Sequence, residues 1–157
     1  MPEPGDVLLV RGRGPIERTV EWTTTSAYSH AAMLAKPGLL IESKEFHGVR
    51  FVPTSTYRGD WYQVVCDEPT RLAALAFAQG KWGSPYGWRE ALDEGLRDIL
   101  HIRSAGERWR KWRHFDCSAL LVAAYFKAGL VLTYRSNPAP GDLGFSPLLR
   151  KLKEEPS

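Results

Sequence analysis

The sequence predicts an α+β domain in which a small antiparallel sheet packs on helices. Short apolar runs separated by Pro, Gly and Asp turns fill the first half of the chain, a pattern typical of an antiparallel meander. In the second half, apolar residues recur at helical spacing instead. Because the chain has 157 residues, of which 43% are hydrophobic, we expect one domain over residues 1–157 with a sizeable core.

Five strands are expected in chain order. They are Val7–Val10, His30–Ala35, Leu39–Ser43, Val49–Val52 and Trp61–Cys66. Between the first two strands, Pro15 is suited to begin a short helix with Ile16 and Val20 on one side. Turns containing glycine separate the later strands: Pro37-Gly38, His47-Gly48 and Arg58-Gly59-Asp60. Strands this short, joined by turns this tight, favour hairpin connections over crossovers.

Helices are expected to follow the strands. The segments are Pro69–Lys81, Arg89 to about Leu100, Asp116–Ala128 and Phe145–Lys153. The third is the clearest, because Asp116 can cap its first turn and Gly129 can end it. Helices that come after a run of strands, and not between them, are typical of the α+β class.

Composition restricts the partners that the chain can have. Its net charge of +3 is compatible with a phosphate, a wall polymer or a lipid headgroup, but is too small to indicate nucleic acid. The two cysteines argue against a disulfide framework. Neither a signal peptide nor an apolar run of the roughly 20 residues of a membrane span is visible. We therefore expect a cytoplasmic protein, released only by lysis or a partner, without metal or cofactor.

Cys117 is the residue that most strongly suggests chemistry. In the first turn of its predicted helix, free backbone N–H groups and the helix dipole would stabilise a thiolate. The same N–H groups could bind an oxyanion. The alternative is a buried cysteine that only packs in the core. The other cysteine, Cys66, precedes acidic Asp67 and Glu68, which disfavour a thiolate, so we interpret it as structural.

A cysteine nucleophile requires an imidazole within hydrogen-bond reach. The candidates are His30, His47, His101 and His114. His30 is favoured because it begins an apolar strand that can hold its ring rigidly, whereas His47 lies in a turn. If the strands of His30 and Glu42 pair as a hairpin, the carboxylate could orient the imidazole. The residues alone favour the alternative, a glutamate exposed to solvent on an edge strand.

Two motifs resemble a known family. Asp116-Cys117-Ser118-Ala119-Leu120-Leu121 resembles the Asp-Cys-Ser-Gly-Leu-Val signature of NlpC/P60 papain-like cysteine peptidases. Ser84-Pro85-Tyr86-Gly87-Trp88 resembles the Pro-Tyr-x-Trp-Gly element that precedes it there. Because the histidine segment comes before the cysteine in this chain, the order is similar to that of the circularly permuted, YiiX/YaeF-like branch. That branch is distantly similar to lecithin:retinol acyltransferase-like proteins.

Further segments resemble that branch in the same order. They are Gly5–Leu9, Tyr28–Met33, Ile41–Ser43 with Gly48-Val49, and Pro140–Leu143 with Ser146-Pro147. The resemblance implies a permuted papain-like fold with Cys117 as nucleophile, His30 as base and Glu42 as the third polar residue. It also implies that the phenol of Tyr86 assists the oxyanion site.

The leading hypothesis is a cysteine hydrolase that cleaves an amide in a peptide or peptidoglycan fragment through a thioacyl intermediate. The alternatives are a lipid acyl hydrolase or acyltransferase, and a binding module without activity. The segment between Trp88 and Phe115 is long and basic and has no counterpart in the family. Its tryptophan-rich part, residues 103–113, is expected to border the cleft; the alternative is a surface loop whose tryptophans only pin it to the core. Arginine beside tryptophan suits an anionic, partly apolar ligand. We assign substrate binding to Ser29, Trp88, Trp109 and Arg110.

Overall fold

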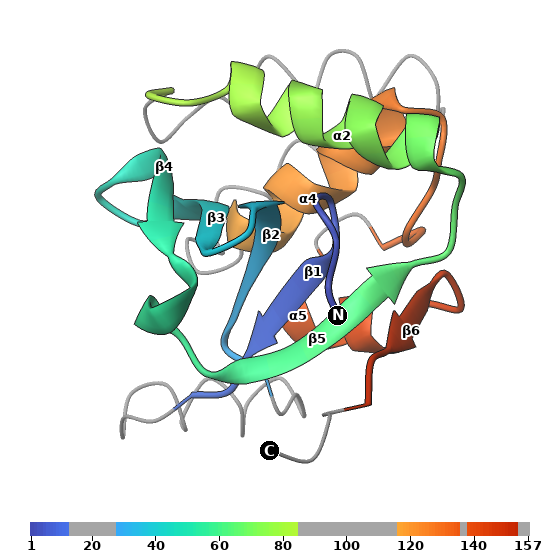
Figure 1. Ribbon diagram of the computed structural model, residues 1–157, viewed down its shortest axis with the longest axis horizontal. Helices are drawn as coiled ribbons and strands as arrows, with labels where there is room; N and C mark the ends of the chain where they lie inside the picture. The colour runs from blue at the N-terminus through green and yellow to red at the C-terminus, as the bar shows by residue number, and fades with distance from the viewer. Residues whose placement is uncertain (13–27, 85–115, 136–137, 154–157) are drawn as a thin grey trace.

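The computed structural model describes residues 1–12, 28–84, 116–135 and 138–153 of the chain. Within these ranges the fold is α+β, with one antiparallel sheet of six strands and the helices gathered mainly on one side of it (Figure 1). The predicted fold class is therefore confirmed. The short helix expected after Pro15 and the helix expected over Arg89–Leu100 lie outside the described residues.

The sheet has the spatial order β4-β3-β2-β1-β5-β6. Its strands are β1 (Val7–Val10), β2 (His30–Lys36), β3 (Leu39–Lys44), β4 (Gly48–Pro53), β5 (Gly59–Val64) and β6 (Leu149–Lys151). All neighbouring pairs are antiparallel, and the hairpins β2–β3 and β3–β4 close at the predicted glycine turns. Strand β1 lies between β2 and β5, with Leu9 opposite both Ala31 and Asp60. The first five strands match the sequence prediction to within about two residues at each end.

The end of the chain corrects one prediction. The segment Phe145–Lys153 was expected to be helical, but it contains the edge strand β6, in which Leu149 pairs with Val64 and Lys151 with Tyr62. The apolar residues there fit a helical spacing, yet the free edge of β5 offers unpaired backbone groups that a strand can satisfy. Burial of Leu149 in the core then favours the strand.

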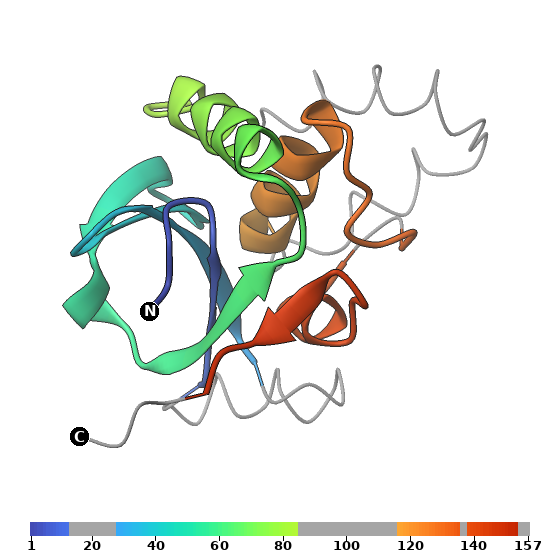
Figure 2. The same cartoon turned by 45° about the vertical axis from the view of Figure 1, so that its right-hand side comes forward.

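Three helices are described. Helix α2 (Glu68–Gly80) begins where the carboxylate of Asp67 accepts a hydrogen bond from the Thr70 N–H at 2.9 Å, with Pro69 in its first turn. Helix α4 (Asp116–Lys127) and the short α5 (Pro140–Gly144) follow later in the chain. A 3-10 turn, η1 (Thr54–Thr56), connects β4 to β5. Figure 2 shows α2 and α4 stacked against the same face of the curved sheet.

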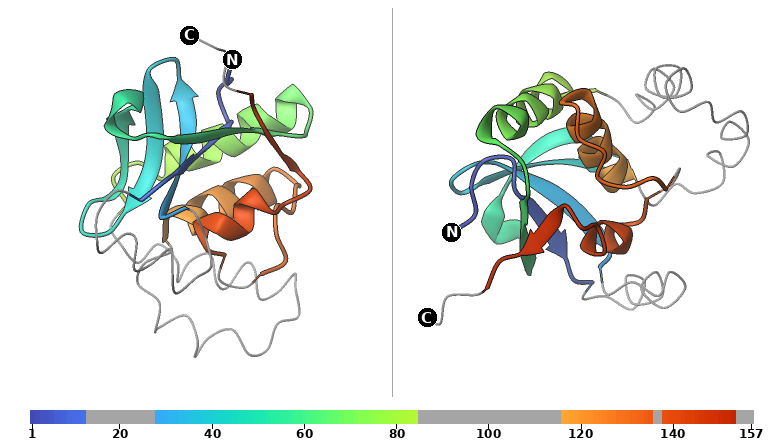
Figure 3. Two further views of the ribbon diagram at one scale, coloured as in Figure 1. Left: turned by 90° about the horizontal axis from the view of Figure 1, so that it is seen from below. Right: turned by 90° about the vertical axis from the view of Figure 1, so that its right-hand side faces the viewer.

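The sheet is buried on both faces, so two apolar cores form. Val7, Leu9 and Met33 face the helices and belong to the larger core, which includes Leu120 and Tyr125 of α4. The alternate residues of the same strands point the other way. They form a second core from the strands themselves: Leu8, Val10, Ala32, Leu34, Leu40 and Val52. Because the sheet curves around this second core (Figure 3), the strands themselves shield the residues on that face, and none of the described helices packs there.

Candidate active site

His30 is the first residue of β2, where it pairs with Val10 of the central strand. The preceding residue is also tied to β1, because the Ser29 backbone N–H donates to the Val10 carbonyl at 3.0 Å. The backbone that carries the imidazole is therefore held by strand pairing. The ring is largely buried, with a side chain 14% exposed, and its Nε2–H donates to Glu42 Oε2 at 2.5 Å.

Glu42 lies on β3, and its side chain is completely buried. The hairpin of β2 and β3 brings it beside His30, as the sequence predicted for a paired hairpin. The alternative of an exposed edge glutamate is wrong for two reasons. Strand β4 covers the outer edge of β3, with Arg50 directly opposite Glu42. The curvature of the sheet also directs this residue toward the second core, where water is excluded.

Among the described residues, three side chains donate hydrogen bonds to the Glu42 carboxylate. Besides His30, these are the Arg50 guanidinium, through Nε at 3.0 Å, and the Tyr57 hydroxyl, at 3.1 Å. Burial on its own would raise the pKa of Glu42, but His30, Tyr57 and Arg50 outweigh it and lower the pKa to about 2. The carboxylate is therefore ionised at neutral pH although it is buried.

Cys117 lies in the first turn of α4 and is 3% exposed. Burial alone would raise the pKa of its thiol. The charge of the His30 imidazolium and its hydrogen bond, followed by the Ala31 backbone N–H, lower the pKa and prevail. Ser118, whose hydroxyl lies 3.9 Å from the Cys117 sulfur, adds to this effect. Since Glu42 occupies Nε2 of His30, Nδ1 is the ring nitrogen left for Cys117.

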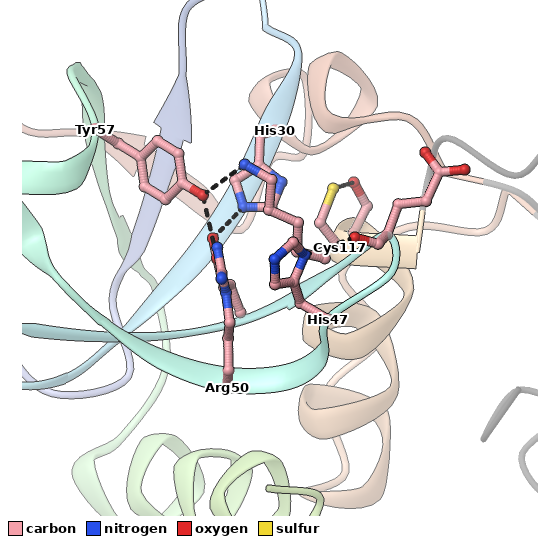
Figure 4. Close-up of polar contacts among 9 residues, drawn as sticks. His30, His47, Arg50, Tyr57 and Cys117 are labelled. Atoms are coloured by element: carbon pink, nitrogen blue, oxygen red, sulfur yellow. Dashed lines mark hydrogen bonds and ion pairs between the residues drawn. The ribbon is translucent and has the colours of Figure 1, made fainter. Parts of the chain in front are cut away.

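The interaction that lowers the pKa of Cys117 raises the pKa of His30. Burial favours the neutral ring and lowers its pKa, but the Cys117 thiolate and the Glu42 carboxylate raise the pKa to about 9. Figure 4 shows the imidazole between Tyr57 on one side and Cys117 on the other. The coupling therefore favours the ion pair of thiolate and imidazolium over the neutral thiol and imidazole.

The remaining predicted site residues divide into two groups. Ser29 is half-buried beside His30. Tyr86, Trp88, Trp109 and Arg110 lie outside the described residues, as do His101, His114 and the side chain of Asp116. His47 is described and lies in the exposed β3–β4 turn, with its Nδ1 2.9 Å from the Glu45 carbonyl oxygen. Cys66 is half-buried, and burial with nearby Asp67 and Asp6 raises the pKa of its thiol, as its acidic neighbours predicted.

Sequence reasoning missed Arg50 and Tyr57. A signal for Arg50 was present, because a hairpin closed at His47-Gly48 places it opposite Glu42. Tyr57 follows η1 and reaches Glu42 across the curved face, which no local pattern in the sequence indicates.

Two structural findings bear on the class of protein. In the described part of the chain, no group of three or more His, Cys, Asp or Glu side chains is arranged to hold a metal ion. Over the same ranges, none of the helices combines the length and apolarity that crossing a membrane requires.

The described residues thus form an α+β fold in which the strand that carries His30, β2, precedes the helix that carries Cys117, α4. This fold occurs in a solved structure, the crystal structure of the metalloprotein yiiX from Escherichia coli O157:H7. The two share 15% sequence identity with a TM-score of 0.66, and the match covers 98% of each chain. No protein-family model and no curated protein matches the sequence. The chain therefore has a YiiX-like fold, and at this identity the likeness concerns the fold.

Proposed function

We propose that this protein is a cysteine hydrolase of the permuted papain-like type, with Cys117 as nucleophile, His30 as acid and base, and Glu42 as the residue that orients the imidazole. The observation that carries the proposal is the coupling of the three groups: a hydrogen bond joins His30 to Glu42, and charge and hydrogen bonding join His30 to Cys117. The motifs that resemble the NlpC/P60 family support it independently.

The proposed reaction starts from a Cys117 thiolate and a His30 imidazolium in the enzyme without substrate. The Cys117 thiolate attacks the substrate carbonyl carbon, and the resulting oxyanion is stabilised by backbone N–H groups at the start of α4. The His30 imidazolium gives its proton to the leaving amine, the C–N bond breaks and a thioacyl enzyme forms. Neutral His30 then takes a proton from water, the hydroxide attacks the thioester, and the acid leaves as the thiolate is restored.

The substrate we propose is an amide in a peptide or peptidoglycan fragment. A lipid acyl ester would undergo the same steps, and its acyl group would be released as a fatty acid. A binding module would require no ionised glutamate buried behind a histidine, since burying a charge is costly even when the charge is paired. The complete set of Cys117, His30 and Glu42 therefore favours an enzyme.

A metal does not fit this arrangement, although the structural neighbour is titled a metalloprotein. Both oxygens of the Glu42 carboxylate already accept hydrogen bonds. One of the donors is the Arg50 guanidinium, 3.0 Å away, whose positive charge would repel a cation at the same carboxylate. The proposed reaction therefore needs only side chains and backbone groups of this chain.

The decisive experiment is iodoacetamide labelling of the two cysteines across pH, read by mass spectrometry. Cys117 should react at pH values well below those at which Cys66 reacts, because only Cys117 has a lowered pKa. Cys117→Ser should abolish hydrolysis of peptidoglycan fragments and acyl esters, while Cys66→Ser should retain it. Labelling of both cysteines with an ordinary thiol pKa near ~8.5 would contradict the proposal.

A further inference from the structure

We propose that Arg50 and Tyr57 are positioning residues of this site, which keep Glu42 ionised and aimed at His30 and thereby sustain the Cys117 thiolate. The inference rests on the proposed function and extends the cysteine, histidine and glutamate set by two side chains. Both side chains contact the Glu42 carboxylate, and we assign them an effect on Cys117 only through that carboxylate.

The two oxygens of Glu42 have separate partners. Oε2 accepts the hydrogen bond from His30, whereas Oε1 accepts from both Arg50 Nε and the Tyr57 hydroxyl. Two donors on one oxygen prevent the carboxylate from rotating about its terminal bond. Oε2 is thus held toward the imidazole, the orientation in which it can stabilise the imidazolium.

Tyr57 is itself held in place from two sides. The Lys44 ammonium donates to its hydroxyl at 3.1 Å and lies 5.2 Å from the ring centroid. The Tyr57 ring also packs against the imidazole of His30, with centroids 5.1 Å apart and planes tilted by 48°. Because the Lys44 ammonium can only donate, the phenolic O–H is left to donate to Glu42. Tyr57 therefore contacts both members of the pair that it orients.

Arg50 supplies the positive charge that allows the buried Glu42 carboxylate to stay ionised. A carboxylate with no exposed surface is protonated unless it is paired, and the guanidinium pairs with Glu42 from a side chain that is 31% exposed. The charged and titratable groups at this carboxylate are His30 of β2, Arg50 of β4 and Tyr57 after η1. Lys44 contacts Tyr57, and Cys117 lies beyond His30. Loss of Arg50 removes a positive charge in direct contact, so Glu42 gains a proton more easily and no longer stabilises the His30 imidazolium.

The test compares Arg50→Gln, Arg50→Lys and Tyr57→Phe with a matched control, Arg150→Gln. Arg150 is an exposed arginine on β6, the opposite edge strand of the sheet. The readouts are the pKa of His30 by NMR titration of its ring and the pH profile of Cys117 labelling by iodoacetamide. We expect Arg50→Gln and Tyr57→Phe to lower the pKa of His30 and to slow Cys117 labelling about tenfold near pH 6, which corresponds to about one pKa unit.

Arg50→Lys should recover part of the labelling rate, because the ammonium keeps the charge but not the Nε geometry, and Arg150→Gln should change neither readout. Unchanged His30 titration and Cys117 labelling in folded Arg50→Gln and Tyr57→Phe would overturn the inference while leaving the hydrolase proposal intact. If Arg50→Gln fails to fold, Tyr57→Phe and Arg50→Lys decide the matter by the same readouts. An ordinary thiol pKa for Cys117 in the unmodified protein would instead refute the hydrolase itself.

Discussion

At the scale of single residues, the site depends on a carboxylate that is buried and yet charged. Glu42 has no exposed surface, and an ionised group in such a place is stable only if its lost hydration is replaced. Three donors replace it, one of them the ring of His30. Removal of any one donor therefore affects the ionisation of the others, because all share the same carboxylate.

Glu42 should make the stability of the fold depend on acid. Its pKa is lowered to about 2 from an ordinary value of 4.5, so its stabilisation is complete above pH 4.5 and is lost as the pH falls toward 2. Urea unfolding of the wild type and of Glu42→Gln should show a stability difference that shrinks over this interval. A difference that stays constant from pH 5 to pH 2 would mean that the carboxylate is not held ionised in the folded state.

At the scale of elements, the pairing of β1 with β5 determines how closely two backbones approach. Gly59 lies opposite Val10, and a Cβ at this position would come within 2.1 Å of the Leu9 carbonyl oxygen. No side chain can occupy that space without moving a central strand. Gly59, which the sequence places in a turn with Arg58 and Asp60, is the first residue of β5, and there the sheet requires a residue without a side chain.

Gly59→Ala is accordingly expected to destabilise the fold by roughly 1–3 kcal/mol, the range for overpacking. Gly80→Ala is the control, because nothing lies within 4 Å of the added methyl at the end of α2. That change should be neutral or stabilising by up to about 1 kcal/mol. Chemical denaturation of both variants measures the difference, and equal midpoints would show that β1 and β5 do not pair as described.

At the scale of the whole molecule, the N-terminal segment is connected to the helix that carries Cys117. The hydroxyl of Tyr125, near the end of α4, donates to the Gly5 carbonyl at 2.7 Å, and the side chain is fully buried. Gly5 in turn precedes β1, and its N–H donates to the Leu34 carbonyl of β2 at 2.8 Å. Helix and sheet are thus tied at the end of α4 opposite Cys117.

Tyr125→Phe should reduce the free energy of unfolding by about 1–2 kcal/mol, because the Gly5 carbonyl loses its buried donor while the ring remains. Tyr134→Phe removes the same hydroxyl from a side chain that is 86% exposed and should stay within about 0.5 kcal/mol of wild type. Thermal unfolding distinguishes the two. Indistinguishable melting temperatures for wild type and Tyr125→Phe would contradict this connection.

The sequence by itself determined the class of fold, five of the six strands in the described residues, the helix that carries Cys117 and the turn that allows the strands of His30 and Glu42 to form a hairpin. These features depend on local periodicity, on turns at glycine and on neighbours close in the chain, all of which a single sequence contains. Only the tertiary structure decided that Glu42 is buried, that Tyr57 and Arg50 complete its hydrogen bonds, and that Leu149 lies in a strand. Each of these depends on the curvature of the sheet or on the free edge of β5, and segments far apart in the chain create such surroundings only when they pack together.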